Sequence, residues 1–219
     1  MPGDPHLLLD DRKTAIYRVA ASLLTGASWL LFRPVVRGAQ KIPLEGPVLI
    51  APIHRSAIDF VFTLFISPRK VFFMAKDPLF RVPVLGPLLL HLGAFPVHRE
   101  SADRESLHLA EEVLRRGHAL VLFPEGTRKY GPHVEPLRDG AMFIAARTGA
   151  AVVPVGIGGS DRAMPAGARL PRPTRIHVVV GDPLAAPIGE GRVSRSAISA
   201  KSEELRAALE AVYAQSRGA

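Results

Sequence analysis

The feature that most constrains the fold of this chain is a series of short, valine-rich apolar runs separated by stretches of helical periodicity. The runs lie at residues 47–52, 71–74, 119–123, 151–157 and 176–180. Runs of this kind are typical of strands buried on both faces of a sheet. Helices are expected at residues 103–116 and 139–148, each followed by a glycine, and near the end at about 199–215. Because strands and helices alternate, the sequence predicts a single α/β domain with a largely parallel mixed sheet flanked by helices.

Length and composition are consistent with one such domain. The chain has 219 residues, of which 47% are hydrophobic and 22% charged, and these values exclude a disordered or fibrous protein. It contains no cysteine, which excludes disulfides, zinc–thiolate sites, iron–sulfur clusters and acyl-cysteine intermediates. Neither H-E-x-x-H nor a comparable ligand spacing occurs, so no metal site is expected.

The formal charge of +8 predicts an acidic partner. The candidates are nucleic acid, an anionic membrane surface and a phosphorylated substrate. Aromatic residues make up only 6% of the chain, and they do not alternate with cations in any strand-like segment. Nucleic acid is therefore not expected as a partner.

The N-terminal segment, residues 1–37, has a helical period with basic flanks. Its apolar positions are Ile16, Val19, Ala20, Leu23, Leu24, Ala27, Leu30 and Leu31. No uncharged apolar run of the chain reaches the ~20 residues that a membrane-spanning helix needs, so we expect a non-spanning, intracellular protein. The segment predicts an amphipathic helix, which either packs on its own domain or lies in a bilayer interface with Tyr17 and Trp29 at headgroup level.

A histidine followed five residues later by an aspartate occurs four times, and a carboxylate-oriented histidine is a common general base at neutral pH. The pairs are His6/Asp11, His54/Asp59, His98/Asp103 and His177/Asp182. The first lies in a terminus, and in the last a strand would separate the two side chains by about 16 Å. The second and third pairs both follow a strand-like run, where open α/β sheets bind ligands. The local sequence around each pair favours His54 only modestly over His98.

A second group of functional residues, Glu125-Gly126-Thr127-Arg128, directly follows the run at 119–123. The glycine permits an unusual turn, the threonine supplies a hydroxyl, and the arginine offers a planar fork for phosphate oxygens. This pattern predicts an anion-binding loop that contains a carboxylate. Glu125 would either accept hydrogen bonds from substrate hydroxyls or fix the loop through backbone amides. The alternative is a surface turn with solvated charges.

Two further cations, Lys76 and Arg99, stand near the ends of strand-like runs. Taken singly, each is more typical of a solvated surface charge. Their shared position relative to the strands favours convergence on one pocket.

Four blocks of the sequence, in order, resemble the motifs of the PlsC-type glycerolipid acyltransferase family, and the chain is similar to 1-acyl-glycerol-3-phosphate acyltransferases. The blocks lie at residues 54–59, 93–99, 123–128 and 152–157, within a region of resemblance from about 38 to 181. Lys76 matches a family lysine between the first two blocks. The order of the blocks favours His54 over His98 as the reactive histidine.

The resemblance implies a role for each matching residue. His54 would be the catalytic base and Asp59 its orienting partner, with Pro154 shaping the site. The implied substrate-binding residues are Arg55, Lys76, Arg99, Glu125, Gly126, Thr127 and Arg128. Among these, Lys76 and Arg99 would hold the acceptor's phosphate, and Glu125, Gly126, Thr127 and Arg128 would form the acceptor pocket. The oxyanion of the reaction needs hydrogen-bond donors, for which backbone amides or Arg55 are candidates. The family often has a polar residue before the histidine, where this chain has Ile53.

The implied reaction moves a fatty acyl group from a thioester donor, acyl-CoA or acyl-carrier protein, to a hydroxyl of 1-acyl-glycerol-3-phosphate, giving phosphatidic acid. No cofactor other than this co-substrate is implied. Other possible acceptors are glycerol 3-phosphate, another lysophospholipid, a glycolipid and a lyso-ornithine lipid. A lysophospholipid acceptor favours the interfacial role of the N-terminal helix. We therefore expect a membrane-association segment at 1–37, a catalytic domain at 38–219, and a peripheral protein on the cytoplasmic face of the cell membrane. A non-catalytic basic module is the alternative from a different class.

Overall fold

The computed structural model describes residues 14–97, 104–187 and 193–218, and its centre is a seven-stranded sheet in the order β1-β7-β6-β2-β5-β3-β4. The strands are β1 (Val35–Arg37), β2 (Val48–Pro52), β3 (Val71–Lys76), β4 (Ala94–Val97), β5 (Ala119–Val121), β6 (Ala151–Gly158) and β7 (His177–Val180). All neighbouring strands are parallel except β6 and β7, which are antiparallel. The predicted α/β class with a largely parallel mixed sheet is confirmed.

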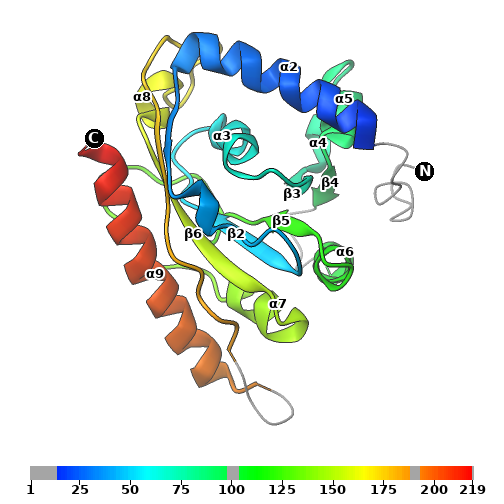
Figure 1. Ribbon diagram of the computed structural model, residues 1–219, viewed down its shortest axis with the longest axis vertical. Coiled ribbons are helices and arrows are strands. Elements are labelled where there is room, and N and C mark those ends of the chain that lie inside the picture. Colours follow the sequence, from blue (N-terminus) through cyan, green and yellow to red (C-terminus); the bar gives the residue numbers. More distant parts are fainter. Residues whose placement is uncertain (1–13, 98–103, 188–192, 219) are drawn as a thin grey trace.

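Helices cover both faces of the sheet (Figure 1). They are α2 (Thr14–Phe32), α3 (Asp59–Ile66), α4 (Asp77–Phe80), α5 (Leu85–His91), α6 (Arg104–Arg115), α7 (Gly140–Thr148), α8 (Ser160–Ala163) and α9 (Arg195–Arg217), with a short 3-10 helix, η2, at Ala39–Lys41. The connections β2–α3–β3 and β5–α7–β6 run in opposite directions along the sheet. Because such crossovers are right-handed, α3 and α7 lie on opposite faces. α2 packs on α3, whereas α6 and α9 pack on α7.

The apolar runs form the strands that the sequence predicts. All five residues of β2 are buried, and β6 is buried from Val152 onward. Two-sided burial of this kind explains why the runs are continuous rather than alternating. Of the expected helices, α6 and α7 match closely, and α9 begins earlier, at Arg195, where the side chain of Ser194 accepts a hydrogen bond from the Ala197 N–H. β1 lies within the segment 1–37 and pairs with β7, so the end of this segment already belongs to the sheet.

α2 is an amphipathic helix whose inner side is anchored to the domain. Tyr17 and Phe32 are buried, and the Tyr17 hydroxyl accepts a hydrogen bond from the Val71 N–H at 3.2 Å. Burial raises the pKa of the Tyr17 phenol. The opposite side of α2 is apolar and exposed, with Leu23 at 70% and Leu30 at 75% exposure. Within the described residues, no helix combines the length and apolarity that crossing a bilayer requires.

Two glycines of β6 set how closely α9 approaches the sheet. A Cβ at Gly156 would lie 2.3 Å from the carbonyl oxygen of Val212, and one at Gly158 would lie 2.2 Å from that of Ser216. Contacts this short require the helix backbone to move. We therefore expect Gly156→Ala to lower the free energy of unfolding by about 1–3 kcal/mol, as overpacking does.

Gly26, in the middle of α2, is the matched control, because a Cβ there would have no heavy atom within 4 Å. Gly26→Ala should raise the free energy of unfolding by about 0.5–1 kcal/mol through helix propensity. Urea denaturation of the two variants measures both effects. Equal stability of Gly156→Ala and the wild type would contradict the account of how α9 packs.

Candidate active site

The candidate residues gather at the carboxyl edge of the sheet. β2 leads into His54, β5 leads into the loop that contains Glu125, and β3 ends at Lys76. These three strands are neighbours in the sheet and run parallel. Their carboxyl ends therefore meet at one edge, which is where open α/β sheets bind ligands.

His54 and Asp59 are in direct contact. His54 Nδ1 lies 3.1 Å from Asp59 Oδ2, and this oxygen also accepts hydrogen bonds from the backbone N–H groups of Arg55 at 2.6 Å and Ser56 at 2.7 Å. Asp59 is fully buried in the first turn of α3. With Nδ1 on this carboxylate, Nε2 is the ring atom left to accept a proton.

The ring of His54 is held from a second direction by Phe123. The two rings stack with centroids 4.1 Å apart and an angle of 28° between their planes. The His54 side chain is still 13% exposed. The imidazole is therefore fixed in orientation and remains accessible from one side.

Arg55 and Glu125 form a buried ion pair beneath the histidine. Arg55 Nη1 donates to both Glu125 carboxylate oxygens, at 2.8 and 2.7 Å, and Glu125 Oε2 also accepts the His54 backbone N–H at 2.9 Å. The Arg55 and Glu125 side chains are 1% and 0% exposed. Both were expected to contact substrate, Glu125 in the acceptor pocket and Arg55 as a candidate oxyanion donor, but in this structure they are engaged with each other.

The Arg55 guanidinium has further partners. Its Nη2 donates to the His133 carbonyl at 2.8 Å, and the group lies over the Tyr213 ring of α9, 4.9 Å from the centroid. Burial lowers the pKa of Arg55, but the hydrogen bond and charge of Glu125, with a smaller contribution from Tyr213, outweigh it and leave the pKa raised. Arg55 is therefore a fixed cation that joins the loop after β2, the loop after β5, and α9.

The rest of the loop after β5 faces outward. Gly126 has φ +71°, and a Cβ there would lie 2.6 Å from Arg138 Nε, so both the turn and the arginine require glycine. Thr127, Arg128 and Lys76 are exposed at the same edge, as an anion-binding role requires. Arg99 and His98 lie outside the described residues.

Three contributors to the site could not be recognised from the sequence. Arg138 is one, because a lone arginine in a loop carries no motif. A second is an apolar pocket of about 270 Å³ beside Phe123. The residues that line it are Met74, Val97, Ser106, Leu107, Val121, Leu122, Phe123, Pro124, Gly126, Arg138, Gly140 and Ala141. The third is the hydrogen bond from Ser56 Oγ to the Met164 carbonyl, 2.9 Å long, which ties the loop after β2 to the segment after α8.

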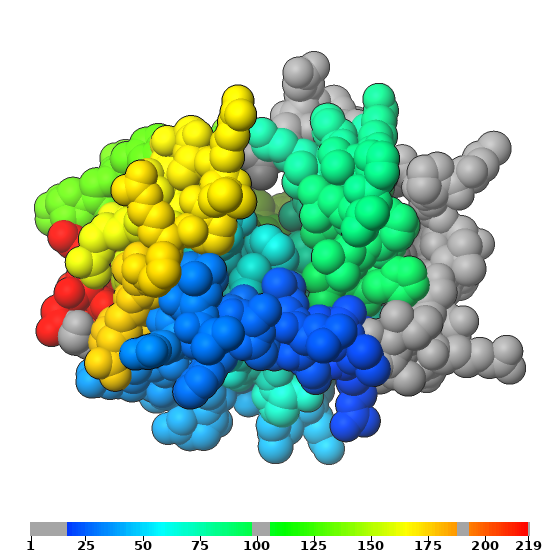
Figure 2. Space-filling model, turned by 90° about the horizontal axis from the view of Figure 1, so that it is seen from above, coloured from blue at the N-terminus to red at the C-terminus, as the bar shows by residue number. Residues whose placement is uncertain are grey.

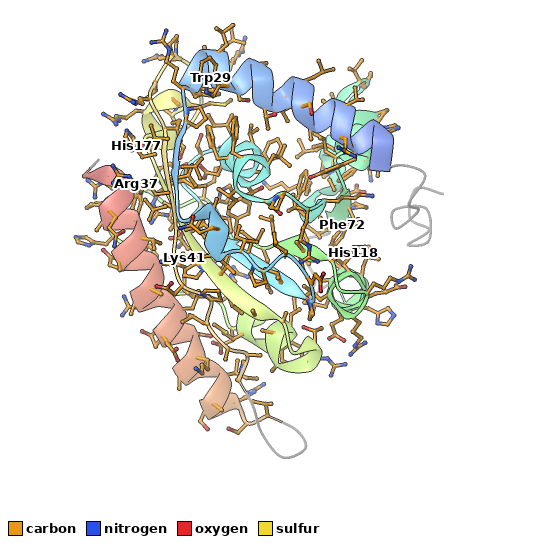
Figure 3. The ribbon with its side chains drawn as sticks, viewed as in Figure 1. Trp29, Arg37, Lys41, Phe72, His118 and His177 are labelled. Atoms are coloured by element: carbon orange, nitrogen blue, oxygen red, sulfur yellow. The ribbon has the colours of Figure 1, made fainter. Side chains whose placement is uncertain are left out.

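The structure also separates one of the rival histidine pairs. Figure 3 shows His177 beside Arg37, on the side of the sheet where β1 and β7 lie. Asp182 forms an ion pair with Lys41 at 2.9 Å. The pair at 177 and 182 is thus part of the β1–β7 region and not of the candidate site. The pairs at 6 and 11 and at 98 and 103 lie outside the described residues.

Known proteins resemble this chain in sequence and fold. A 1-acyl-sn-glycerol-3-phosphate acyltransferase of Bacillus subtilis is 30% identical over 151 residues, which cover 68% of this chain and 72% of the relative. A chloroplastic 1-acyl-sn-glycerol-3-phosphate acyltransferase of Brassica napus is 29% identical over 170 residues, covering 75% of this chain and 49% of the relative. The chain thus spans about half the length of the plant relatives it matches.

The crystal structure of the 1-acyl-sn-glycerophosphate acyltransferase PlsC from Thermotoga maritima has the same fold. It superimposes with a TM-score of 0.76 at 24% identity, over 94% of this chain and 83% of that one. The acyltransferase family profile matches residues 33–158, which is more than half of the chain and includes the loops that carry His54 and Glu125. The chain belongs to the acyltransferase family.

Proposed function

We propose that the protein transfers a fatty acyl group from a thioester donor, acyl-CoA or acyl-carrier protein, to the free hydroxyl of 1-acyl-glycerol-3-phosphate, giving phosphatidic acid. The observation that carries this proposal is the His54–Asp59 contact at the carboxyl edge of the sheet. The names of the relatives support the acceptor. Another lysophospholipid, glycerol 3-phosphate, a glycolipid or a lyso-ornithine lipid is the alternative.

His54 would act as the general base. A glycerol hydroxyl is a poor nucleophile until it loses its proton, and His54 Nε2 accepts this proton as the oxygen attacks the thioester carbonyl carbon. Asp59 keeps the Nδ1–H in place and stabilises the imidazolium. The tetrahedral intermediate collapses as the carbon–sulfur bond breaks, and the imidazolium proton neutralises the departing thiolate. Because Ser56 Oγ is bonded to a backbone carbonyl, we infer direct transfer without an acyl-serine.

Glu125 and Arg55 would position the base rather than touch the substrate. Glu125 holds the His54 backbone N–H, and Arg55 neutralises Glu125 where water has no access. Breaking such a buried pair leaves an uncompensated charge, which typically destabilises a protein by about 3–5 kcal/mol. The pair therefore fixes the backbone that carries the imidazole.

The exposed cations at the site edge would hold the acceptor's phosphate. Lys76 and Arg128 reach this edge from neighbouring strands, and Gly126 and Thr127 lie in the same loop. Arg99 remains part of the proposal by its place in the sequence. The apolar pocket beside Phe123 would take a fatty chain close to the base, because Phe123 both lines the pocket and stacks on His54.

α2 would lie in the interface of an anionic membrane, as a peripheral attachment on the cytoplasmic face. Its exposed side carries Val19, Leu23, Trp29 and Leu30. Two arginines are also exposed: Arg18 on α2 and Arg33 directly after its end. Apolar side chains with flanking cations match the acyl boundary and the headgroups of an anionic leaflet. Segment 1–37 is accordingly proposed as the membrane-association segment and 38–219 as the catalytic domain.

Replacing His54 by alanine should lower kcat by about 10²–10⁴-fold, the range that a general base contributes. His108→Ala is the matched control, because this histidine is exposed on α6 and does not line the pocket beside Phe123. Product formation from purified protein, with mixed acyl donors and a panel of lyso-lipids, is measured by mass spectrometry.

The same panel tests the acceptor. We expect lysophosphatidate to be the preferred lyso-lipid. Turnover of an uncharged lyso-lipid without turnover of lysophosphatidate would remove the phosphate assignment. A fully active His54→Ala variant would contradict the base assignment, and an inactive wild type would favour a non-catalytic module.

Glu125→Gln distinguishes positioning from substrate binding. If Glu125 acts through His54, kcat falls by about tenfold or more while the KM for lysophosphatidate stays within about twofold. Glu135→Gln, an exposed carboxylate farther along the same loop, should leave both constants unchanged. A raised KM with an unchanged kcat would show instead that Glu125 contacts the acceptor.

Trp29 is the only tryptophan and is 59% exposed, so its fluorescence reports on α2 directly. Adding phosphatidylglycerol vesicles should shift its emission to shorter wavelength, and raising the salt concentration should weaken the shift, because screening reduces the attraction of the arginines. Phosphatidylcholine vesicles serve as the control and should produce a smaller shift. An emission spectrum that no vesicle changes would refute the interfacial role of α2.

A further inference from the structure

The connection between α4 and α5 contains a strained turn. The Leu85 N–H donates to the Pro83 carbonyl at 2.8 Å, and the residue between them, Val84, has φ 68° and ψ −48°. This is a γ-turn of the rare, positive-φ type. A β-branched residue is particularly disfavoured at positive φ. Such strain persists only where the surrounding structure holds it, and it often marks a functional segment.

The strained turn presents apolar side chains to the outside. Val84 is 82% exposed, and Val82, Leu79 and Leu88 are between 39% and 44% exposed. We call residues 79–88 the apolar tip. Its interior is packed, because Gly86 is buried and a Cβ there would lie 2.1 Å from the Phe80 carbonyl oxygen. The apolar tip is therefore a rigid projection and not a loosely folded loop.

A second projection, rich in arginine, follows β6. We call residues 161–175 the basic arm. It contains Arg162, Arg169, Arg172 and Arg175 and a single acidic residue, Asp161. All four arginines are exposed, and Leu170 among them is 78% exposed. Burial, together with Arg175, Arg37 and Arg162, lowers the pKa of the neighbouring His177, as expected beside a concentration of positive charge.

The two projections flank the catalytic loops. Along the carboxyl edge, the basic arm follows β6, His54 follows β2, the Glu125 loop follows β5, and the apolar tip follows β3 and begins within α4. The sheet has these four strands in the same order. Seen from above, the yellow segment after β6 and the turquoise segment after β3 rise on either side of a hollow, with α2 along its front (Figure 2). A flat surface that touches both projections would cover the mouth of the site.

We propose that the apolar tip and the basic arm dock together onto an anionic lipid bilayer and place the mouth of the active site against it. This inference rests on the proposed lipid acyltransferase function. The apolar tip enters the acyl boundary, and the arginines of the basic arm contact lipid phosphates, with Leu170 inserted among them. A bilayer suits both elements, because it offers an apolar layer and anionic headgroups at adjacent depths. Docking in this way would let a lysolipid enter the site without leaving the membrane.

Site-specific labelling tests the apolar tip, because a chain without cysteine accepts a single introduced thiol. In the test variant, Val84→Cys carries an environment-sensitive fluorophore. The matched control is Phe143→Cys, a partly exposed position on α7, which lies on the face of the sheet opposite α3. With phosphatidylglycerol vesicles, emission from position 84 should rise several-fold and be quenched by spin labels on the lipid acyl chains. Emission from position 143 should not change.

Two substitutions test the physical basis of docking. Val84→Gly keeps the turn, because glycine adopts positive φ without strain, so the melting temperature should not fall while vesicle binding weakens. Arg169→Ala and Arg172→Ala should each weaken partitioning into anionic vesicles about fivefold, the equivalent of about 1 kcal/mol per surface cation.

The outcomes distinguish docking through the apolar tip and the basic arm from the interfacial role proposed for α2. If position 84 is silent while Trp29 responds, α2 docks alone and the present inference is overturned. Unchanged vesicle binding by Val84→Gly and both arginine variants would overturn it as well. A response of position 84 to acyl-carrier protein but not to vesicles would make the surface a protein-docking site instead. If neither Trp29 nor position 84 responds, the membrane role proposed for α2 fails too.

Discussion

One buried carboxylate, that of Asp59, determines the geometry of the site. Three donors meet at its Oδ2: the two successive backbone N–H groups of residues 55 and 56, and the His54 ring. The carboxylate thus closes the turn between β2 and α3 and orients the imidazole with the same atom. Removing it would lose the local backbone conformation together with the orientation of the imidazole. Local folding and the geometry of the site therefore depend on the same interaction.

A second interaction connects this turn to the rest of the molecule. The ion pair of Arg55 and Glu125 joins loops that are 70 residues apart in sequence, and the stacking of Arg55 on Tyr213 extends the connection to α9. Glycines in β6 let α9 approach closely enough for this contact. The position of the imidazole thus depends on packing on the far face of the sheet.

The sequence predicts the parts of this arrangement that local patterns determine. Strands buried on both faces leave continuous apolar runs, so β2, β3, β5, β6 and β7 can be located, whereas a three-residue edge strand such as β1 leaves too short a pattern. The His54–Asp59 spacing alone is ambiguous, because the same spacing occurs at 177 and 182, where the aspartate pairs with Lys41 instead. The mutual burial of Arg55 and Glu125 depends on contacts across the sheet. Both were placed among the substrate-binding residues at first, because nothing in the sequence shows that the two side chains neutralise each other.

The central claim is that Asp59 holds the Nδ1–H of His54 and leaves Nε2 free to take the proton of the acceptor hydroxyl. Nitrogen-15 NMR of histidine-labelled protein tests it most directly, with the His54 signals assigned by comparison with His54→Ala. In the neutral ring the account predicts a protonated Nδ1 and an unprotonated Nε2. A neutral ring protonated at Nε2, or a rapidly exchanging mixture of the two tautomers, would contradict it.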